Sequence, residues 1–415
     1  MGIFIDIHEL KQYNPGTFNR GDNGEAKQIN IGGINRVRFS SQCQKRAIRE
    51  AMALPEIRTA SIENLIEKLL LKAVELGKIN EDEMNAIGTA ICSKEIIGTE
   101  CWLKRKSLSK EEKGENSSGN VMVNTNAAEL DALIETFINK VKEEGIDSIK
   151  DKKKWVSIVN DSNLNNVYVS KAKAMFGNMA VEGIIGTVDG AIEFGQAFSI
   201  DAYLPESDFF TATFSGNSGE NEKDPFFGVY EEYKEKENKK RYAETINQGL
   251  SLYSNTLYTY SNINLKALET NLNTFINNKT YKENNSTKDT IKEIVPNFIR
   301  EFINMVPSAT QRRSSSHVVP SIVYIEVINN GCNLQPDWNK VIKNKQDKSI
   351  TEQGIEKLLS FAIDTTFRTG EISKYVMISS DYNNYKELFE NSGIKVINNF
   401  DELNAIIINE IDRLL

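Results

Sequence analysis

The sequence predicts an α+β protein, because short segments with alternating apolar residues occur between longer segments with helical spacing. Residues 3–10 alternate around Ile5, Ile7 and Glu9, which is the pattern of a half-buried strand. The other strand-like segments are 188–203, 255–263, 318–328, 375–379 and 394–397. The helices expected among them are 265–277, 288–305 and 400–415. Strands that are separated by helices and return to one sheet predict a ferredoxin-like domain, which we call the palm.

Two segments interrupt the palm. Residues 57–177 contain several stretches with helical spacing, at 61–76, 81–91, 126–144 and 154–177, and predict a mainly helical insertion. Residues 205–254 predict an exposed excursion, because 215–240 is rich first in Gly, Ser and Asn and then in Glu and Lys. The expected order is therefore palm (1–56), helical insertion (57–177), palm strand (178–204), excursion (205–254), and the rest of the palm with a C-terminal helix (255–415).

Composition excludes several classes of protein. The 415 residues exceed the usual size of one core, and no long uncharged apolar run is present to span a membrane. Four cysteines without CxxC spacing and only two histidines argue against a structural zinc site, so we expect free thiols in a cytoplasmic protein. A net charge of −8 argues against a protein that coats nucleic acid nonspecifically, because such binding depends on positive charge over the whole surface. Any nucleic acid must therefore bind in a local groove.

Residues 19–52 are basic in this acidic chain. A Gly32-Gly33 turn and a short strand lead to a helix for which Ser40 and Ser41 are natural N-caps. Helical spacing places Gln42, Lys45 and Arg49 on one polar stripe, and Ala47, Ile48, Ala51 and Met52 on a buried one. A helix N-terminus beside Lys and Arg side chains can hold phosphates. The alternative is a solvated helix face, which is what charged runs usually form.

Several motifs occur in the same order in a known family. The N-terminal ones are Ile7-His8, Asn19-Arg20-Gly21-Asp22, Gly32-Gly33, and Arg36-Val37-Arg38-Phe39-Ser40-Ser41-Gln42 with Lys45-Arg46. The later ones are Val188-Asp189-Gly190-Ala191, Ser261-Asn262-Ile263-Asn264-Leu265 and Val306-Pro307-Ser308-Ala309-Thr310-Gln311-Arg312. With these motifs the chain resembles the CasC-type backbone subunit of the CRISPR surveillance complex Cascade, subtype I-E. The resemblance fades in the helical insertion and between residues 330 and 374.

The resemblance implies an RRM-like palm with helical fingers (57–177) and a β-hairpin thumb (205–254). It implies a subunit that oligomerises along CRISPR guide RNA (crRNA) and presents it for base pairing with a target DNA strand. Sequence is then read by base pairing, while the protein contacts the RNA backbone and recognises its shape. The expected partners are guide RNA, target DNA through the guide, further copies of the chain and other Cascade subunits, with no membrane. We expect no cofactor, no metal ion and no catalytic residue.

Family positions that contact guide RNA correspond to Arg20, Lys27, Ser40, Gln42, Lys45, Arg46 and Arg49. Arg46 could instead pair with Glu50, and Arg36 and Arg38 could simply face solvent beside the sheet. A second RNA contact is expected at Gln311 and Arg312, for which a turn capped by its own side chains is the alternative.

The thumb of the family presses apolar side chains between bases. Here the candidates are Met179, Phe209 and Phe210, and their alternative is ordinary core packing. Lys152, Lys153 and Lys154 resemble a lysine-rich element that holds target DNA, but a lysine run is more often a solvated face.

Two rival functions are open. Backbone subunits of the related type III complexes cut target RNA with a loop aspartate and a metal ion, and Asp22 lies in the equivalent loop. Metal-assisted cleavage usually needs more carboxylate or histidine ligands than this loop has, so we expect no cleavage. His8 is expected at an edge position of the first strand, without a catalytic partner. The second rival is a stand-alone RRM-like RNA binder, but no RNP-like aromatic segment is present.

Overall fold

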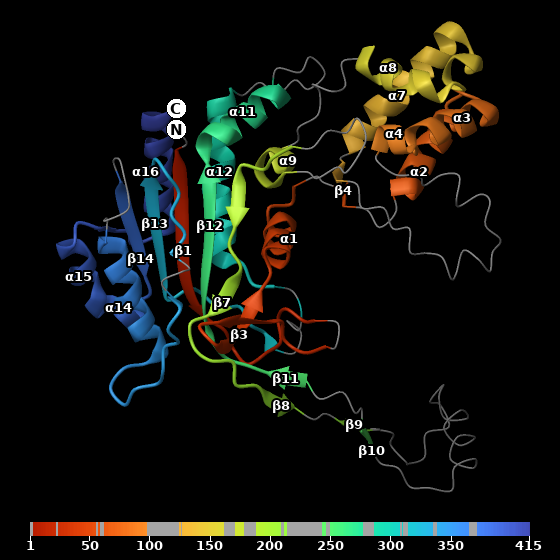
Figure 1. The fold of residues 1–415 in the computed structure, drawn as a ribbon. Coiled ribbons are helices and arrows are strands. Elements are labelled where there is room, and N and C mark those ends of the chain that lie inside the picture. The colour runs from red at the N-terminus through yellow and green to blue at the C-terminus, as the bar shows by residue number, and fades with distance from the viewer. Residues whose placement is uncertain are drawn as a thin grey trace, which may run out of the picture.

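The structure is a computed structural model. It describes the chain except for residues 1–2, 22–23, 55–56, 59–61, 98–123, 126, 162–170, 178–187, 209–210, 214–242, 246–249, 277–285, 308, 310–313, 335–337 and 365–371. The described residues form a mixed α+β fold around one nine-stranded sheet (Figure 1).

The order of strands across this sheet is β15 (Lys395–Val396), β14 (Ser373–Ile378), β13 (Ile322–Ile328), β1 (Phe4–Gln12), β12 (Thr256–Asn264), β7 (Ala197–Ser199), β3 (Ile34–Phe39) and β2 (Gln28–Ile31). Strand β6 (Ile192–Phe194) also pairs with β12. Neighbouring strands are antiparallel except β14 and β15, which are parallel. The strands predicted from alternation are thereby confirmed, and the segment 188–203 contributes both β6 and β7.

Four strand positions at the centre of the sheet have a simple order. Leaving aside the β2–β3 hairpin, the chain enters the sheet at β1, then at β6 and β7, then at β12, and finally at β13. Across the sheet the spatial order is β13, β1, β12 and then β6 with β7. In order along the chain these are the fourth, first, third and second, and all neighbours are antiparallel. The helices α11 (Leu265–Ile276) and α12 (Thr287–Asn304) connect β12 to β13.

Both faces of the sheet are covered, so β1 is buried along almost its whole length rather than half-buried as its alternation predicted. On one face Ile5 and Ile7 pack in a core with α1 (Ser41–Ala51), α9 (Lys171–Phe176), α11, α12 and α16 (Phe400–Leu414). On the other face Leu10 packs in a core with α14 (Ile350–Ile363) and α15 (Lys386–Asn391). The expected edge position of His8 is wrong, because β1 lies between β12 and β13 and His8 is fully buried.

A separate group of helices has its own hydrophobic core, which contains Phe137 and Trp155. Its helices are α2 (Ile62–Glu75), α3 (Glu81–Ile91), α4 (Lys94–Ile97), α7 (Ala127–Glu144), the 3-10 helix η1 (Ile146–Ile149) and α8 (Lys152–Asp161), with a two-stranded ladder of β4 (Ile57–Arg58) and β5 (Asn124–Thr125) nearby in sequence. Figure 1 shows the helices of this group clustered apart from the sheet. By contrast, α9 packs into the core of the sheet.

Two short ladders lie within residues 205–254. Strand β8 (Glu206–Asp208) pairs with β11 (Leu250–Leu252), and β9 (Thr211–Thr213) pairs with β10 (Ala243–Thr245), both antiparallel. The chain therefore leaves the palm and returns along paired strands, toward the bottom of Figure 1.

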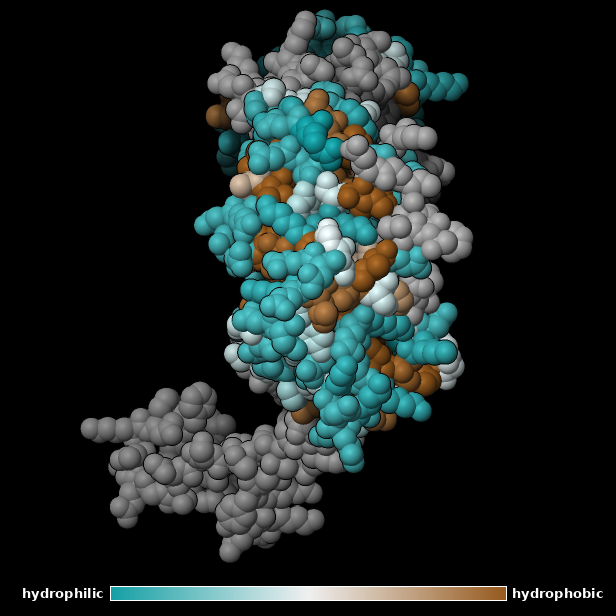
Figure 2. Space-filling model, turned by 90° about the vertical axis from the view of Figure 1, so that its left-hand side faces the viewer, coloured by the Kyte–Doolittle hydropathy of each residue, from teal (hydrophilic) through white to brown (hydrophobic). Residues whose placement is uncertain are grey.

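The face that carries α14 and α15 is turned toward the viewer in Figure 2. It is largely hydrophilic, and its hydrophobic residues form separate small areas. Among the described residues, no helix has the length and apolar character needed to cross a membrane.

Candidate nucleic-acid interface

A tight hairpin leads the chain into α1. Ile31 pairs with Ile34, so Gly32 and Gly33 form a two-residue turn, with φ values of +62° and +82°. Such positive φ angles at both positions suit glycine and match the twist of the flanking strands. A Cβ atom on Gly32 would lie 2.1 Å from the carbonyl oxygen of Asn339, so this turn is also packed against another segment.

Ser40 is the N-cap of α1, as predicted. Its Oγ accepts a hydrogen bond from the backbone N–H of Cys43 at 3.3 Å. Its own N–H donates to Oδ1 of Asn19 at 2.9 Å, and the N–H of Lys27 donates to the carbonyl oxygen of Asn19 at 2.8 Å. Arg20 pairs with Ala26 in an isolated bridge. These bonds bring the backbone of Arg20 and Lys27 next to the start of the helix, so these two residues share one neighbourhood with Ser40 and with Gln42, which is exposed in the first turn.

Lys45 and Arg49 lie over aromatic rings at the margin of the sheet core. Nζ of Lys45 is 5.7 Å from the ring centroid of Phe194, and Cζ of Arg49 is 5.7 Å from that of Phe176. Both distances suit cation–π contacts. The predicted stripes need correction here, because Arg49 is only 7% exposed whereas Ala51 is exposed.

The guanidinium of Arg49 has two buried terminal nitrogens with no hydrogen-bond partner among the described residues. A buried charged donor without an acceptor is costly, and most such groups in proteins have a partner. Because both nitrogens are buried, an anion would reach them only after the Arg49 side chain turns outward.

Arg46 and Glu50 form the i,i+4 pair that was the alternative role of Arg46, with Nε 2.7 Å from Oε1. Both side chains are more than half exposed, at 72% and 55%, so the pair contributes little to stability. Arg46 can consequently exchange this partner for another anion at small cost.

The interpretation that Arg36 faces solvent beside the sheet is wrong. Arg36 is fully buried and donates to the carbonyl oxygens of Trp338 at 2.8 Å, Asn339 at 3.1 Å and Ser199 at 3.3 Å. Burial lowers the pKa of the guanidinium, while the nearby Asp201 carboxylate opposes that shift. Arg38 is partly buried and donates to Oε1 of Gln196 at 3.3 Å. Arg36 therefore joins the hairpin to the 338–339 segment.

Several predicted site residues lie outside the described part of the chain, namely Asp22, Met179, Phe209, Phe210, Gln311 and Arg312. Lys152, Lys153 and Lys154 are exposed and begin α8, and Nζ of Lys152 lies 5.8 Å from the ring centroid of Trp155. They belong to the separate helical group and not to the surroundings of α1.

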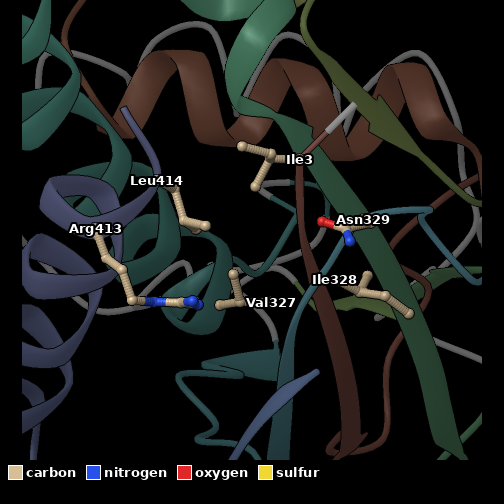
Figure 3. Close-up of a pocket in the computed structure, with 6 residues that line it drawn as sticks. All are labelled: Ile3, Val327, Ile328, Asn329, Arg413 and Leu414. Atoms are coloured by element: carbon tan, nitrogen blue, oxygen red, sulfur yellow. The ribbon is translucent and has the colours of Figure 1, made fainter. Parts of the chain in front are cut away.

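A pocket of about 110 Å³ lies where the ends of β1, β13 and α16 meet (Figure 3). Ile3, Val327, Ile328 and Leu414 give it an apolar lining, and the Arg413 side chain extends toward Val327. The guanidinium of Arg413 is paired with Glu410 at 2.7 Å. The pocket contains none of the predicted site residues.

Sequence reasoning missed a buried polar cluster in the middle of the sheet. Asp6, His8 and Glu326 are all fully buried and lie together on β1 and β13. The only signal was the i,i+2 spacing of Asp6 and His8, since Glu326 is distant in sequence.

The fold is similar to that of chains from two solved structures. One, "CRISPR RNA-guided surveillance complex, pre-nicking", is 19% identical with a TM-score of 0.68, over 98% of this chain and all of the other. The second, "CRISPR RNA-guided surveillance complex", is 17% identical with a TM-score of 0.63, over 98% of this chain and 99% of the other. At these identities the likeness establishes a shared fold.

No curated protein matches the sequence. The family model described as "CT1975-like protein" (Cas_CT1975) matches residues 5–404, and the chain therefore belongs to this CRISPR-associated family.

Proposed function

We propose that this chain is a non-catalytic, cytoplasmic RNA-binding subunit that oligomerises along CRISPR guide RNA as the backbone of a Cascade complex. It presents the guide for base pairing with invading DNA and contacts other Cascade subunits. Family membership and a fold shared with chains of RNA-guided surveillance complexes over nearly their full length support this role. The order of motifs favours the CasC type of subtype I-E.

The observation that carries the proposal is the buried Arg49 guanidinium in the last turn of α1, whose two terminal nitrogens have no acceptor among the described residues. One RNA phosphate would lie beside Lys45 and Arg49, and another would lie in front of α1, where the helix N-terminus adds its partial positive charge. Ser40 and Gln42 would add hydrogen bonds without charge, and Arg20, Lys27 and Arg46 would follow the RNA backbone.

The proposed RRM-like palm rests on the antiparallel strand order of β13, β1, β12 and β6–β7, which is the order of a ferredoxin-like sheet. The separate core of the helical group supports its role as fingers, and the paired arms of the excursion support its role as a hairpin thumb. Met179, Phe209 and Phe210 remain the proposed wedges between bases. Gln311 and Arg312 remain a second RNA contact, and Lys152–Lys154 a contact to target DNA.

The test is RNA binding by the double variant Lys45→Ala and Arg49→Ala over a series of salt concentrations. Binding should weaken, and the slope of log affinity against log salt should flatten by roughly one unit for each lost phosphate contact. Guides with different spacers should be affected about equally, because phosphate contacts carry no sequence information.

The matched control is Lys288→Ala with Lys292→Ala, which also removes two positive charges. Both lysines are on α12 and pair with Asp412 of α16. This control should keep the wild-type slope. If the slope is unchanged in the Lys45 and Arg49 variant while circular dichroism shows intact folding, RNA does not bind along α1 and the proposed interface is wrong.

The alternative function is a type III-like ribonuclease that cuts target RNA with Asp22 and a metal ion. We expect the purified chain, loaded with guide, to leave single-stranded target RNA and DNA intact in Mg²⁺ or Mn²⁺, because the loop offers too few ligands. Gel analysis of labelled targets is the measurement. Regularly spaced cuts that disappear in Asp22→Ala would favour the ribonuclease.

A further inference from the structure

The buried cluster of Asp6, His8 and Glu326 lies at the centre of the sheet, away from the α1 interface. In the register of the sheet Asp6 is directly opposite Glu326 on β13 and opposite Asn262 on β12. His8 follows on the same face of β1, between Tyr260 and Tyr324. The three side chains have no exposed surface.

Their donor atoms are close enough to share one ion. One ligand atom of each residue, an imidazole nitrogen and two carboxylate oxygens, can be chosen so that all lie within 4.8 Å of one another. An imidazole with two carboxylates is a donor set that suits divalent transition metals such as Zn²⁺ and Mn²⁺, whereas Mg²⁺ and Ca²⁺ prefer oxygen ligands alone.

Charge also favours a cation at this position. Two carboxylates directly opposite each other on neighbouring strands repel, and burial strengthens the repulsion. Lys374 lies on the other side of Glu326 in the register and supplies at most one positive charge, while its Nζ donates to the carbonyl oxygen of Ala362. A divalent ion between Asp6 and Glu326 would remove the repulsion.

Surrounding groups orient each of the three side chains. Asp6 accepts from the Tyr260 hydroxyl at 3.2 Å and from the backbone N–H of Cys332 at 2.6 Å. Nδ1 of His8 lies 2.8 Å from the Tyr258 hydroxyl, and Glu326 accepts from the Tyr324 hydroxyl. Metal ligands in proteins are typically held by such outer hydrogen bonds, which fix their orientation.

Asn262 gives an independent indication. It is 94% buried, being 6% exposed, and its Nδ2 donates to Glu193 at 3.1 Å and to the Tyr260 hydroxyl at 3.3 Å. Its Oδ1, next to Asp6 in the register, has no hydrogen-bond partner among the described residues. An amide oxygen of this kind is a suitable further ligand for a cation.

We propose that Asp6, His8 and Glu326 bind a structural divalent transition-metal ion, with the Asn262 oxygen beside them. The ion would tie β1 to β13 and β12 at the centre of the sheet. It would contribute to folding and has no part in RNA binding, so the proposal is independent of the proposed function.

The test is the metal content and thermal stability of the full-length chain, produced without an affinity tag or chelator. Because the site is buried, the protein should also be unfolded with chelator and refolded with or without Zn²⁺ or Mn²⁺. We expect roughly one ion per chain, and a higher melting temperature after refolding with Zn²⁺ or Mn²⁺ than without. Refolding with Mg²⁺ or Ca²⁺ should not produce this shift.

Two variants distinguish a metal site from carboxyl groups that merely share a proton. Glu326→Gln keeps the shape but should lose the ion and the metal-dependent shift, and His8→Gln should do the same. Glu193→Gln is the matched control at the exposed end of the same row, and it should keep both. Chains that contain no metal and melt at the same temperature with and without Zn²⁺ or Mn²⁺ would overturn the proposal. A Glu326→Gln variant that is as stable as metal-refolded wild type would overturn it too.

Discussion

Two arginines near α1 illustrate how differently a buried guanidinium can be used. Arg36 donates to three carbonyl oxygens and is thereby a structural link. Arg49 lies over Phe176 with two terminal nitrogens that have no acceptor among the described residues. In the sequence, both are simply basic residues of the charged segment 19–52. Their burial could not be predicted, because it depends on partners such as Trp338, which is 302 residues from Arg36 in sequence.

Asp201 beside Arg36 provides a test at the same scale. Burial raises the pKa of its carboxyl from an ordinary 3.8 to about 6, although Asn255 donates to it at 2.8 Å. Between these two pH values the folded chain holds a proton that the unfolded chain has released, so Asp201 lowers stability as pH rises through this window. Above about pH 6 the loss is complete.

Asp201→Asn should therefore gain stability relative to wild type as pH rises from 3.8 to 6, and the difference should then level off. Urea unfolding at several pH values measures it, with Asp189→Asn, at an exposed position, as control. A difference that is constant across this window would contradict the assigned burial of Asp201.

At the scale of elements, the sequence correctly predicted features that depend only on neighbouring residues, such as helix caps and turns. The cap of α1 at Ser40, the Gly32-Gly33 turn and the bounds of α3 agree with their signals, because capping and turn chemistry involve neighbours in sequence. Alternation located β1 but predicted one buried face, because the other face carries the polar residues Asp6 and His8, which are nevertheless fully buried. The Asp6, His8 and Glu326 cluster arises from strand register, which a single sequence does not reveal.

The β2–β3 hairpin gives a prediction with its own internal control. Gly32→Ala and Gly33→Ala both place alanine at positive φ, which costs about 1–2 kcal/mol. Only the Gly32 substitution also meets the carbonyl oxygen of Asn339, whereas a Cβ on Gly33 has no atom within 4 Å. Gly32→Ala should be the more destabilising in chemical unfolding, by about a further 1–3 kcal/mol. Equal losses would show that the hairpin is not packed on the 338–339 segment.

For the whole molecule, the acidic balance and the basic interface act in opposite directions. Copies with a net charge of −8 repel one another, so they should associate stably only when RNA lies along the basic residues around α1. The excursion is the proposed bridge to the next copy. Deleting residues 216–240, which lie outside the described residues, should leave single-copy RNA contacts intact and reduce cooperativity along the strand.

The most direct test of the central claim is light scattering of the chain with and without a guide RNA of fixed length. We predict small species without RNA, and with RNA a cooperative rise to one large mass that is set by the length of the guide. The 216–240 deletion should reach that mass less cooperatively. The same mass with and without guide RNA would contradict the account of the chain as an RNA-templated backbone subunit.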